Sequence, residues 1–351
     1  MTNVSIKQVA KLAGVSIATV SRCLNSPEKV TARTRSKVER AISKTGYTPN
    51  EIARNFRRGR SNMIMVVLPS IGDPFFTEVM MGIREAAKLS GFSLLINETA
   101  GNTITADEIG AMVVSKQAEG IILLASLSPF GTEVVSTSSR QALPIVIGCE
   151  TVSPELAQFP AVRIDNAAAA ADAANYLIQH GHRCIGMVSG HVSSLLTRDR
   201  EAGYRSAMAD AGLPIEDGWI VYGRLTVDGA CEATRALLGH ATPPTAIFCA
   251  NDLMAMGCMH EIRRAGLSIP KDISVIGFDD IVLASVLDPP LTTIRQPARE
   301  IGRRVMDRLC REIEHGRHGD GHPEIVPHEL VVRSSVAAAP VRGRRGARGS
   351  A

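Results

Sequence analysis

Polar side chains that could bind a small hydroxylated molecule follow three short apolar runs of this sequence. Asp73 comes after MIMVVLP, Asn251 after TAIFCA, and Asp279 after ISVIGF. If these runs are parallel strands, the polar side chains gather beyond the carboxyl ends of the strands, where such sheets bind ligands. Carboxylate, amide and guanidinium groups beside aromatic rings are the set that holds sugar hydroxyls or a ribose. The candidate binding residues are Asp73, Phe75, Phe76, Arg200, Asn251 and Asp279.

Each candidate also has a purely structural interpretation. The Asp and Asn side chains could cap helices that begin there, and the two Phe rings could belong to the core. The residue types alone leave both interpretations open.

The amino-terminal 60 residues carry a different chemistry, an excess of basic side chains. They hold 13 Lys and Arg against three acids, a net charge of +10, whereas the rest of the chain has a net charge of −6. A basic module on an acidic body is typical of proteins that bind polyanions. A solvated basic surface would have the same composition, so the motif around the charges has to decide.

The spacing within this segment predicts a helix-turn-helix. Ser5 and Gln8 form a capping box, in which each residue can satisfy a backbone N–H of the first helical turn. Gly14 supplies the turn between the first two helices. The first predicted helix begins at Ile6, the second spans 17–24 and the third spans 32–44. Their N-caps are Ser5, Ser16 and Thr31.

The second helix would be the one that reads DNA, and its outward side chains define what it can read. Arg22 is the only one of them able to make a bidentate bond to guanine, whereas Ile17 and Ala18 can only pack against thymine methyl groups. Short hydroxyl and amide side chains suit phosphate contacts, although capping alone would also explain them. The residues of this kind are Ser16, Thr19, Ser21, Asn25 and Thr31.

From residue 61 onward, short apolar runs alternate with helical segments. Strands of continuous apolar residues between helices favour parallel sheets that are covered on both faces. About 270 residues exceed one comfortable core, so we expect two α/β lobes. The expected strands are 63–69, 92–96, 120–125, 144–149, 184–189, 245–250 and 273–278, and the expected helices are 76–89, 105–117, 167–180, 198–211, 230–239, 252–265 and 298–314.

Composition argues against several classes of protein. No run reaches about 18 apolar residues, which argues against a transmembrane helix, and the N-terminus lacks the apolar stretch of a secretory signal. The seven cysteines are scattered without a CxxC pair, which fits a reducing cytoplasm. No nucleophile–base set or phosphate-binding loop stands in the required context, so we expect no enzyme activity, no cofactor and no metal.

Taken together, these motifs resemble one family. SIKQVAKLAGVSIATVSRCLN, followed by TGYTPNEIARNFRRGRS, is similar to the DNA-binding head and hinge of the lactose-repressor (LacI/GalR) family of transcription regulators. The phrases DPFF, GHR, PPTAIFCANDLMAMG, DISVIGFDD and DPPLTTIRQP match downstream, so the resemblance covers nearly all of residues 3–335. Within the family, NSPEKVTARTR, DPFF, PPTAIFC and DPPLTTI most resemble the cytidine-repressor branch.

The resemblance implies an order of domains and a set of partners. It implies a helix-turn-helix domain over 1–49, a hinge over 50–60, a two-lobed periplasmic-binding-protein-like domain for effector binding and dimerisation over 61–335, and a disordered basic tail over 336–351. The partners implied are operator DNA, a second copy of the chain and a small effector between the lobes, with no membrane partner.

The resemblance also implies roles for single residues. The family's hinge wedges an apolar side chain into the minor groove, and here Phe56 replaces the usual Leu. Arg224 stands where nucleobase-binding members have a stacking aromatic residue, which disfavours a nucleoside and leaves room for an anion. Arg200 and Asp279 are expected on opposite sides of the cleft opening in the same lobe, with Arg200 near the start of a helix. Phe75 and Phe76 are expected to come from the other lobe. The hinge residues expected at DNA are Asn50, Ala53, Phe56 and Arg57.

Two other interpretations explain less. A periplasmic sugar-binding protein would account for 61–335 but would need an export signal, and an enzyme on a doubly wound fold would leave the helix-turn-helix unexplained. We therefore expect a cytoplasmic DNA-binding regulator that is controlled by a sugar, a nucleoside or a phosphorylated derivative.

Overall fold

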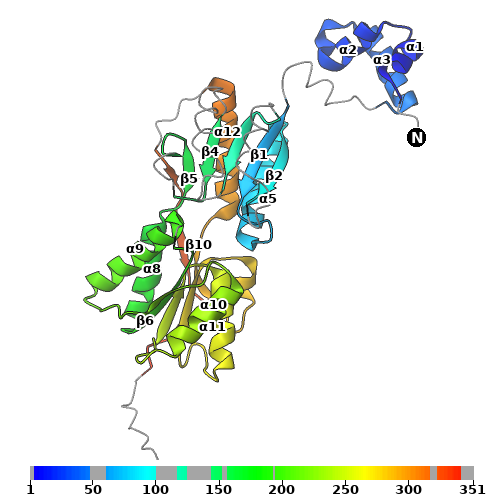
Figure 1. The fold of residues 1–351 in the computed structure, drawn as a ribbon. Helices are drawn as coiled ribbons and strands as arrows, with labels where there is room; N and C mark the ends of the chain where they lie inside the picture. Colours follow the sequence, from blue (N-terminus) through cyan, green and yellow to red (C-terminus); the bar gives the residue numbers. More distant parts are fainter. Residues whose placement is uncertain are drawn as a thin grey trace, which may run out of the picture. The chain divides into compact units, whose positions relative to one another are not determined.

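The computed structural model describes residues 4–47, 61–99, 117–124, 144–151, 156–192, 194–316 and 322–340. The chain divides into two units, Met1–Ser61, called the head unit, and Asn62–Ala351, called the body. Figure 1 shows the helices of the head unit and the two sheets of the body. In the part of the chain just given, no helix is both long enough and apolar enough to cross a membrane.

Short helices pack around a small apolar core in the head unit. The predicted caps are present: the backbone N–H of Ser5 donates to Gln8 Oε1 at 2.7 Å, and Ser16 Oγ accepts from the N–H of Thr19 at 3.0 Å. Gly14 ends the first helix with φ 66°, a left-handed conformation that glycine adopts without strain. The elements are α1 (Ile6–Ala13), α2 (Ile17–Asn25), the 3-10 helix η1 (Pro27–Lys29) and α3 (Ala32–Thr45). The helix-turn-helix prediction is confirmed.

The body contains two six-stranded sheets. The first has the order β11-β5-β4-β3-β1-β2 and is parallel throughout, and the second has the order β12-β10-β9-β8-β6-β7 and is parallel except for β12. The strands are β1 (Met63–Leu68), β2 (Ser93–Glu98), β3 (Gly120–Leu123), β4 (Ile145–Gly148), β5 (Ala161–Arg163), β6 (Ile185–Ser189), β7 (Ile220–Tyr222), β8 (Ala246–Cys249), β9 (Ser274–Asp279), β10 (Thr292–Arg295), β11 (Glu324–Ile325) and β12 (Glu329–Val331). The expected two-lobed, mostly parallel α/β body is confirmed.

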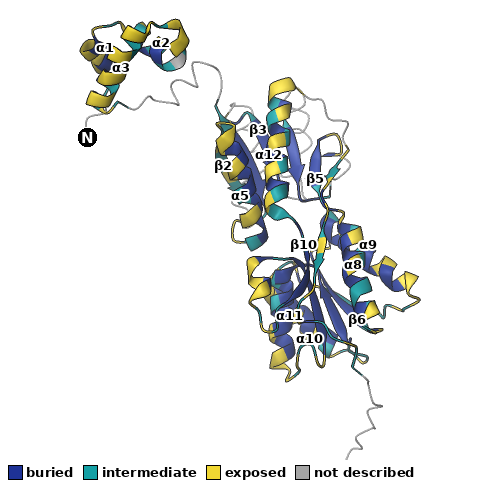
Figure 2. Cartoon of the chain, turned by 180° about the vertical axis from the view of Figure 1, so that it is seen from behind, coloured by how far each residue is buried: buried dark blue, intermediate teal, exposed yellow. Residues whose placement is uncertain are grey.

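Helices cover each sheet and bury its apolar strands (Figure 2). Among the described helices, α5 and α12 pack with the first sheet as the first lobe, and α8, α9, α10 and α11 pack with the second sheet as the second lobe. The helices are α5 (Pro74–Leu89), α8 (Asn166–Gln179), α9 (Leu195–Asp210), α10 (Val227–Leu238), α11 (Asp252–Arg264) and α12 (Ala298–His315). The helix expected over 105–117 falls almost entirely outside the described residues.

The described chain passes between the lobes at three places. It leaves the first lobe between β5 and α8, returns between β10 and α12, and leaves again between β11 and β12. Because α12 comes late in the sequence yet packs on the first sheet, each lobe is built from separate stretches of chain.

The end of the body differs from the prediction. The predicted disordered tail begins at residue 336, but Val336–Pro340 packs against the second lobe. A ring nitrogen of the buried His182 lies 3.1 Å from the carbonyl oxygen of Ala337, and the N–H of Ala339 donates to the carbonyl oxygen of His180 at 2.8 Å. The low-complexity composition gives no sign of these contacts with the backbone. Because of them, the body extends at least to residue 340.

The close contact between α5 and α12 gives a test of the first lobe. A Cβ atom on Gly302 would lie 2.0 Å from the backbone oxygen of Val79. We therefore expect Gly302→Ala to lower the free energy of unfolding by about 1–3 kcal/mol, because the helices would have to separate. Urea unfolding followed by circular dichroism measures this. Gly239→Ala, an exposed site with φ −81° whose nearest atom would lie 3.3 Å away, should change stability far less, and an equal loss in both variants would contradict this explanation.

Candidate functional site

A cavity of about 240 Å³ lies where the carboxyl ends of the strands of both lobes meet. The first lobe contributes residues after β1 and β4, and the second contributes α9 and the ends of β7, β8, β9 and β10. All seven residues that the sequence suggested for ligand binding line it: Asp73, Phe75, Phe76, Arg200, Arg224, Asn251 and Asp279. The rule that ligands bind beyond the carboxyl ends of parallel strands suggested six of them, and the family resemblance suggested Arg224.

In the first lobe, the lining residues are also structural. Asp73 is the N-cap of α5, and its Oδ1 accepts from the N–H of Phe75 at 2.9 Å. The rings of Phe75 and Phe76 meet edge to face with centroids 5.2 Å apart, and both are buried. Asp73 caps the helix and the two Phe rings pack in the core, and all three residues also line the cavity. Both roles are possible because the start of α5 forms part of the cavity wall.

In the second lobe, Arg200 organises the wall. Arg200 is only 2% exposed, and its guanidinium carbon lies 3.7 Å from the ring centroid of Phe278. Its Nε donates to Asn166 Oδ1 at 3.0 Å, and its Nη2 lies 3.7 Å from Asp279 Oδ1. The expectation that Arg200 and Asp279 stand on opposite sides of the opening is wrong, because burial of the guanidinium requires a carboxylate beside it. Arg200 also lies within α9 (Leu195–Asp210), past its first turn, because the helix is capped earlier, at Ser194.

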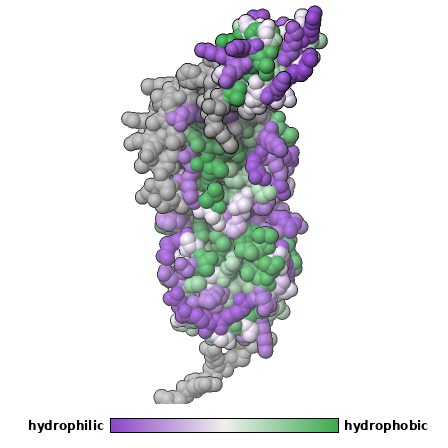
Figure 3. All heavy atoms as spheres, turned by 90° about the vertical axis from the view of Figure 1, so that its right-hand side faces the viewer, coloured by the Kyte–Doolittle hydropathy of each residue, from purple (hydrophilic) through white to green (hydrophobic). Residues whose placement is uncertain are grey.

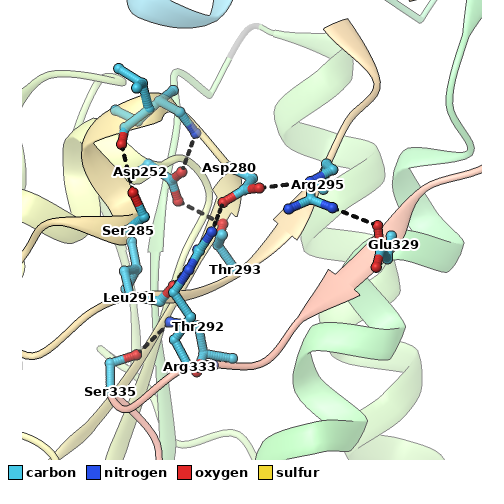
Figure 4. A network of polar contacts seen from close by, with 12 residues as sticks. Asp252, Asp280, Ser285, Leu291, Thr292, Thr293, Arg295, Glu329, Arg333 and Ser335 are labelled. Carbon is cyan, nitrogen blue, oxygen red and sulfur yellow. Dashed lines mark hydrogen bonds and ion pairs between the residues drawn. The ribbon is translucent and has the colours of Figure 1, made fainter.

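The corner at Asp279 and Asp280, the turn that ends β9, connects the cavity to the point where the chain leaves β10 for the first lobe. Both residues have positive φ, 110° and 56°, which costs free energy for residues other than glycine. Asp279 Oδ1 accepts from Gln296 Nε2 at 2.7 Å beside the cavity. Asp280 instead forms ion pairs at 2.7 Å with Arg295 and with Arg333 (Figure 4). One turn of chain thus places one carboxylate at the cavity and the next against Arg295, where the chain leaves β10 for the first lobe, and against Arg333, which follows β12.

The predicted DNA-reading residues lie on α2 of the head unit. Ile17, Ala18 and Arg22 are exposed, and Ile17 is 43% exposed although it is apolar. Val20 and Cys23 of the same helix are buried. Within residues 4–47, one face of α2 is therefore left uncovered.

The predicted phosphate-contacting residues are placed less uniformly. The hydroxyls of Ser16 and Thr31 cap α2 and α3, and Thr19 shares a hydrogen bond with Ser16 at 2.8 Å. Ser21 is half-buried. The side chain of Asn25 and the hinge residues Asn50, Ala53, Phe56 and Arg57 lie outside the described residues.

Known proteins combine the same two parts. Residues 5–50 match the model of the family described as bacterial regulatory proteins, lacI family, and residues 174–336 match that of a periplasmic binding protein-like domain. The chain is 39% identical over 339 residues to the HTH-type transcriptional repressor CytR of Escherichia coli (strain K12), covering 97% of this chain and 98% of the relative. The chain belongs to the lacI family of bacterial regulatory proteins.

Other transcriptional regulators are similar over nearly their whole length. The HTH-type transcriptional repressor PurR of Photobacterium profundum is 34% identical, covering 95% of this chain and 98% of the relative. The structure of the lac repressor dimer bound to operator and the anti-inducer ONPF has a TM-score of 0.83 at 28% identity, covering 96% of this chain and all of the other. The complex of the regulator CelR with cellobiose has a TM-score of 0.72 at 29% identity, covering 95% and 99%. The resemblance to the lactose-repressor family is confirmed.

In this lacI-family chain, four polar cavity residues escaped the sequence interpretation, and one of them, Ser70, follows β1. Cys149 and Glu150 directly follow β4, so the strand-end rule applied to PIVIGC would have found them. Gln296 follows β10, a four-residue strand that was not expected. Burial raises the pKa of the Glu150 carboxyl to about 8, although Arg200 opposes this shift.

Arg224, where the sequence departs from nucleobase-binding members of the family, is paired with an acid in the structure. Arg224 lines the cavity with φ 55°, but its Nη2 lies 3.0 Å from Glu232 Oε2 and its side chain is 55% exposed. The guanidinium that suggested room for an anion is therefore paired with an acid of α10.

The buried Glu150 predicts a pH dependence of stability. Because its folded pKa of about 8 lies above the ordinary value of 4.5, the folded protein keeps a proton that the unfolded chain releases. Glu150 therefore lowers stability progressively as pH rises from about 4.5 to about 8. We expect Glu150→Gln to remove this loss, measured by urea unfolding between pH 4.5 and 8.5 with the fluorescence of the single tryptophan, Trp219. A pH profile that the substitution leaves unchanged would contradict the assignment.

Proposed function

We propose that this chain represses transcription in the cytoplasm by binding operator DNA as a homodimer, with its operator affinity set by a small molecule in the cavity. The domains that we assign are the DNA-binding domain over 1–49, the hinge over 50–60 and the effector and dimerisation domain over 61–340. The observation that carries this proposal is one chain with a helix-turn-helix and a cavity lined by carboxyl, amide, guanidinium and phenyl groups from two lobes.

The DNA-binding role is supported by the exposed face of α2. An apolar side chain at Ile17 gains little from water but can pack on a thymine methyl group, and Arg22 can bond both O6 and N7 of a guanine. The net charge of +10 in the first 60 residues supplies the phosphate attraction. The hinge residues, with Phe56 as the wedge, complete the expected contacts in the minor groove.

The homodimer is supported by an apolar groove on the first lobe. The groove has a volume of about 680 Å³, lies along α5 and β2, and includes Met80, Met81, Phe92, Leu94 and Ile96. Figure 3 shows hydrophobic residues gathered on this face of the body. We assign a second copy of the chain as its occupant, because a two-fold operator requires two heads and the similar lac repressor structure is described as a dimer on operator.

The effector role is supported by the chemistry of the cavity wall. Phe75 and Phe76 offer an apolar surface, while Asp73, Asn251 and Asp279 offer groups that bond hydroxyls. A sugar or a nucleoside fits this combination of groups. Phosphorylated derivatives are the third class of effector that we expect from the sequence. An effector bound more tightly by one lobe arrangement would shift the population of that arrangement.

Selection of duplexes from a random pool tests the DNA-binding proposal. We expect enrichment of a pseudo-palindrome bound by two chains, with log K falling by about 0.9 per neutralised phosphate for each unit of log salt, over roughly 6–10 phosphates. Gel shifts across a salt series measure this, with the isolated body as the control. A salt-independent shift, or no enriched duplex in a protein that still binds a small ligand, would favour the binding-protein alternative instead.

Arg22 tests the assignment of the reading helix. We expect Arg22→Ala to cost about 1–3 kcal/mol per half-site on the selected duplex and to relax base preference at one symmetric position. The matched control is Arg40→Ala, an exposed arginine of α3 whose Nε donates to the carbonyl oxygen of Ser36 at 3.1 Å. It should weaken selected and random duplexes by similar factors. If Arg22→Ala behaves in the same way as the control, α2 does not read bases through this residue.

A further inference from the structure

The guanidinium groups of the cavity are already engaged within the protein. Arg200 donates through Nε to Asn166 at 3.0 Å and through Nη1 to a backbone carbonyl, and its Nη2 lies 3.7 Å from Asp279. Arg224 is paired with Glu232 at 3.0 Å. An anionic ligand would therefore have to compete with a protein carboxylate for either cation.

Two hydrogen-bond acceptors on residues that line the cavity, by contrast, are left unpaired. Within the described residues, Glu150 Oε2 and Gln296 Oε1 are buried and have no hydrogen-bond partner. The side chains belong to residues that are 7% and 4% exposed, and both residues line the cavity. The amide nitrogen of Gln296 is held by Asp279 at 2.7 Å, which leaves its oxygen as the unpaired atom. A buried acceptor without a donor costs free energy that a donating ligand would recover.

The charge of the cavity points the same way. Three carboxyl groups line it, those of Asp73, Glu150 and Asp279. Burial raises the pKa of each, to about 8 for Glu150 and to about 7 for Asp279. A positive charge placed among them would favour their ionised forms, whereas a second negative charge would meet repulsion.

We propose that the cavity selects its effector by charge, taking a small molecule whose amino or ammonium nitrogen donates to Glu150 and Gln296 and excluding phosphates and carboxylates. This inference rests on the proposed function, because it takes the cavity to be the effector site. It narrows the proposed classes to amine-bearing sugars or nucleosides. Binding of an ammonium group at neutral pH also displaces a proton from Glu150 into solvent.

Titration calorimetry of the full chain at pH 7 tests the charge selection with two matched sets of probes. The first set is glucosamine, glucose and glucuronate, and the second is 5′-amino-5′-deoxyinosine, inosine and inosine monophosphate, so that each set runs from an ammonium through a neutral molecule to an anion. We expect the amine to bind at least about tenfold more tightly than its neutral counterpart in one set, and the anion to bind most weakly in both. Repeating the glucosamine titration in two buffers of different ionisation enthalpy should show proton release.

Three variants assign the preference to the named residues. Glu150→Gln should abolish the preference for the amine, whereas Glu201→Gln, an acid of α9 paired with Arg205 outside the cavity, should keep it. Glu232→Gln lies on the surface and frees Arg224, so it should strengthen binding of glucuronate or inosine monophosphate. This third variant keeps the test decisive if Glu150→Gln does not fold.

The outcomes separate this inference from the proposed function. A panel in which no amine exceeds its neutral counterpart, or in which an anion binds most tightly, overturns the charge selection. If Phe76→Ala abolishes the binding of such a neutral or anionic probe, the cavity is still the effector site and only the charge selection fails. If Phe76→Ala leaves the binding unchanged, the ligand binds elsewhere, and the proposed effector site fails with it.

Discussion

The burial of Arg200 is the interaction on which the cavity depends. Removing a guanidinium from water costs several kcal/mol unless its donors and charge are matched. Here α8 supplies the acceptor Asn166, the end of β8 supplies a carbonyl, and β9 supplies both the ring of Phe278 and the carboxylate of Asp279. A helix and two strand ends are thus held to one planar group, which fixes the wall of the second lobe.

That requirement explains the unusual backbone beside it. Asp279 ends β9 with its carboxylate near Arg200, and Asp280 must then turn away to reach Arg295 and Arg333. The chain makes this turn with two successive positive φ angles. Asp252, buried beneath the turn, accepts from the N–H of Ile281 at 2.9 Å and so holds the strained segment from below. The ion pairs and this hydrogen bond offset the strain.

Sequence patterns predicted the parts of this molecule that depend on local physics. The caps at Ser5, Ser16 and Thr31 follow from short polar side chains before apolar helical spacing, and the buried strands follow from continuous apolar runs. The strand-end rule then predicted six of the lining residues without knowledge of their contacts, and only Arg224 came from the family resemblance. None of these steps needs a partner that is distant in the sequence.

The missed features depend on distant partners. β10 is rich in threonine and short, and it becomes a strand because β9 pairs with it along its length. Gln296 was missed for the same reason, since its place in the cavity follows from that pairing. The contact of Arg200 with Asp279 joins residues from α9 and β9, and only the packing of the second lobe sets their separation.

These contacts also indicate how occupancy of the cavity would act on the lobes. Gln296 both lines the cavity and begins the segment that returns to the first lobe, and its neighbour Arg295 is tied to Asp280. A ligand that bonds Gln296 therefore acts directly on a crossing segment, with no relay through the close-packed cores. It can shift the lobes only by as much as it prefers one arrangement of that segment. Whatever factor it thereby applies to operator affinity, the operator must apply to ligand affinity in return. The turn at Asp279 and Asp280 would couple ligand binding to the arrangement of the lobes. Asp279 contacts the cavity, and Asp280 is paired with Arg295, the residue before the crossing segment.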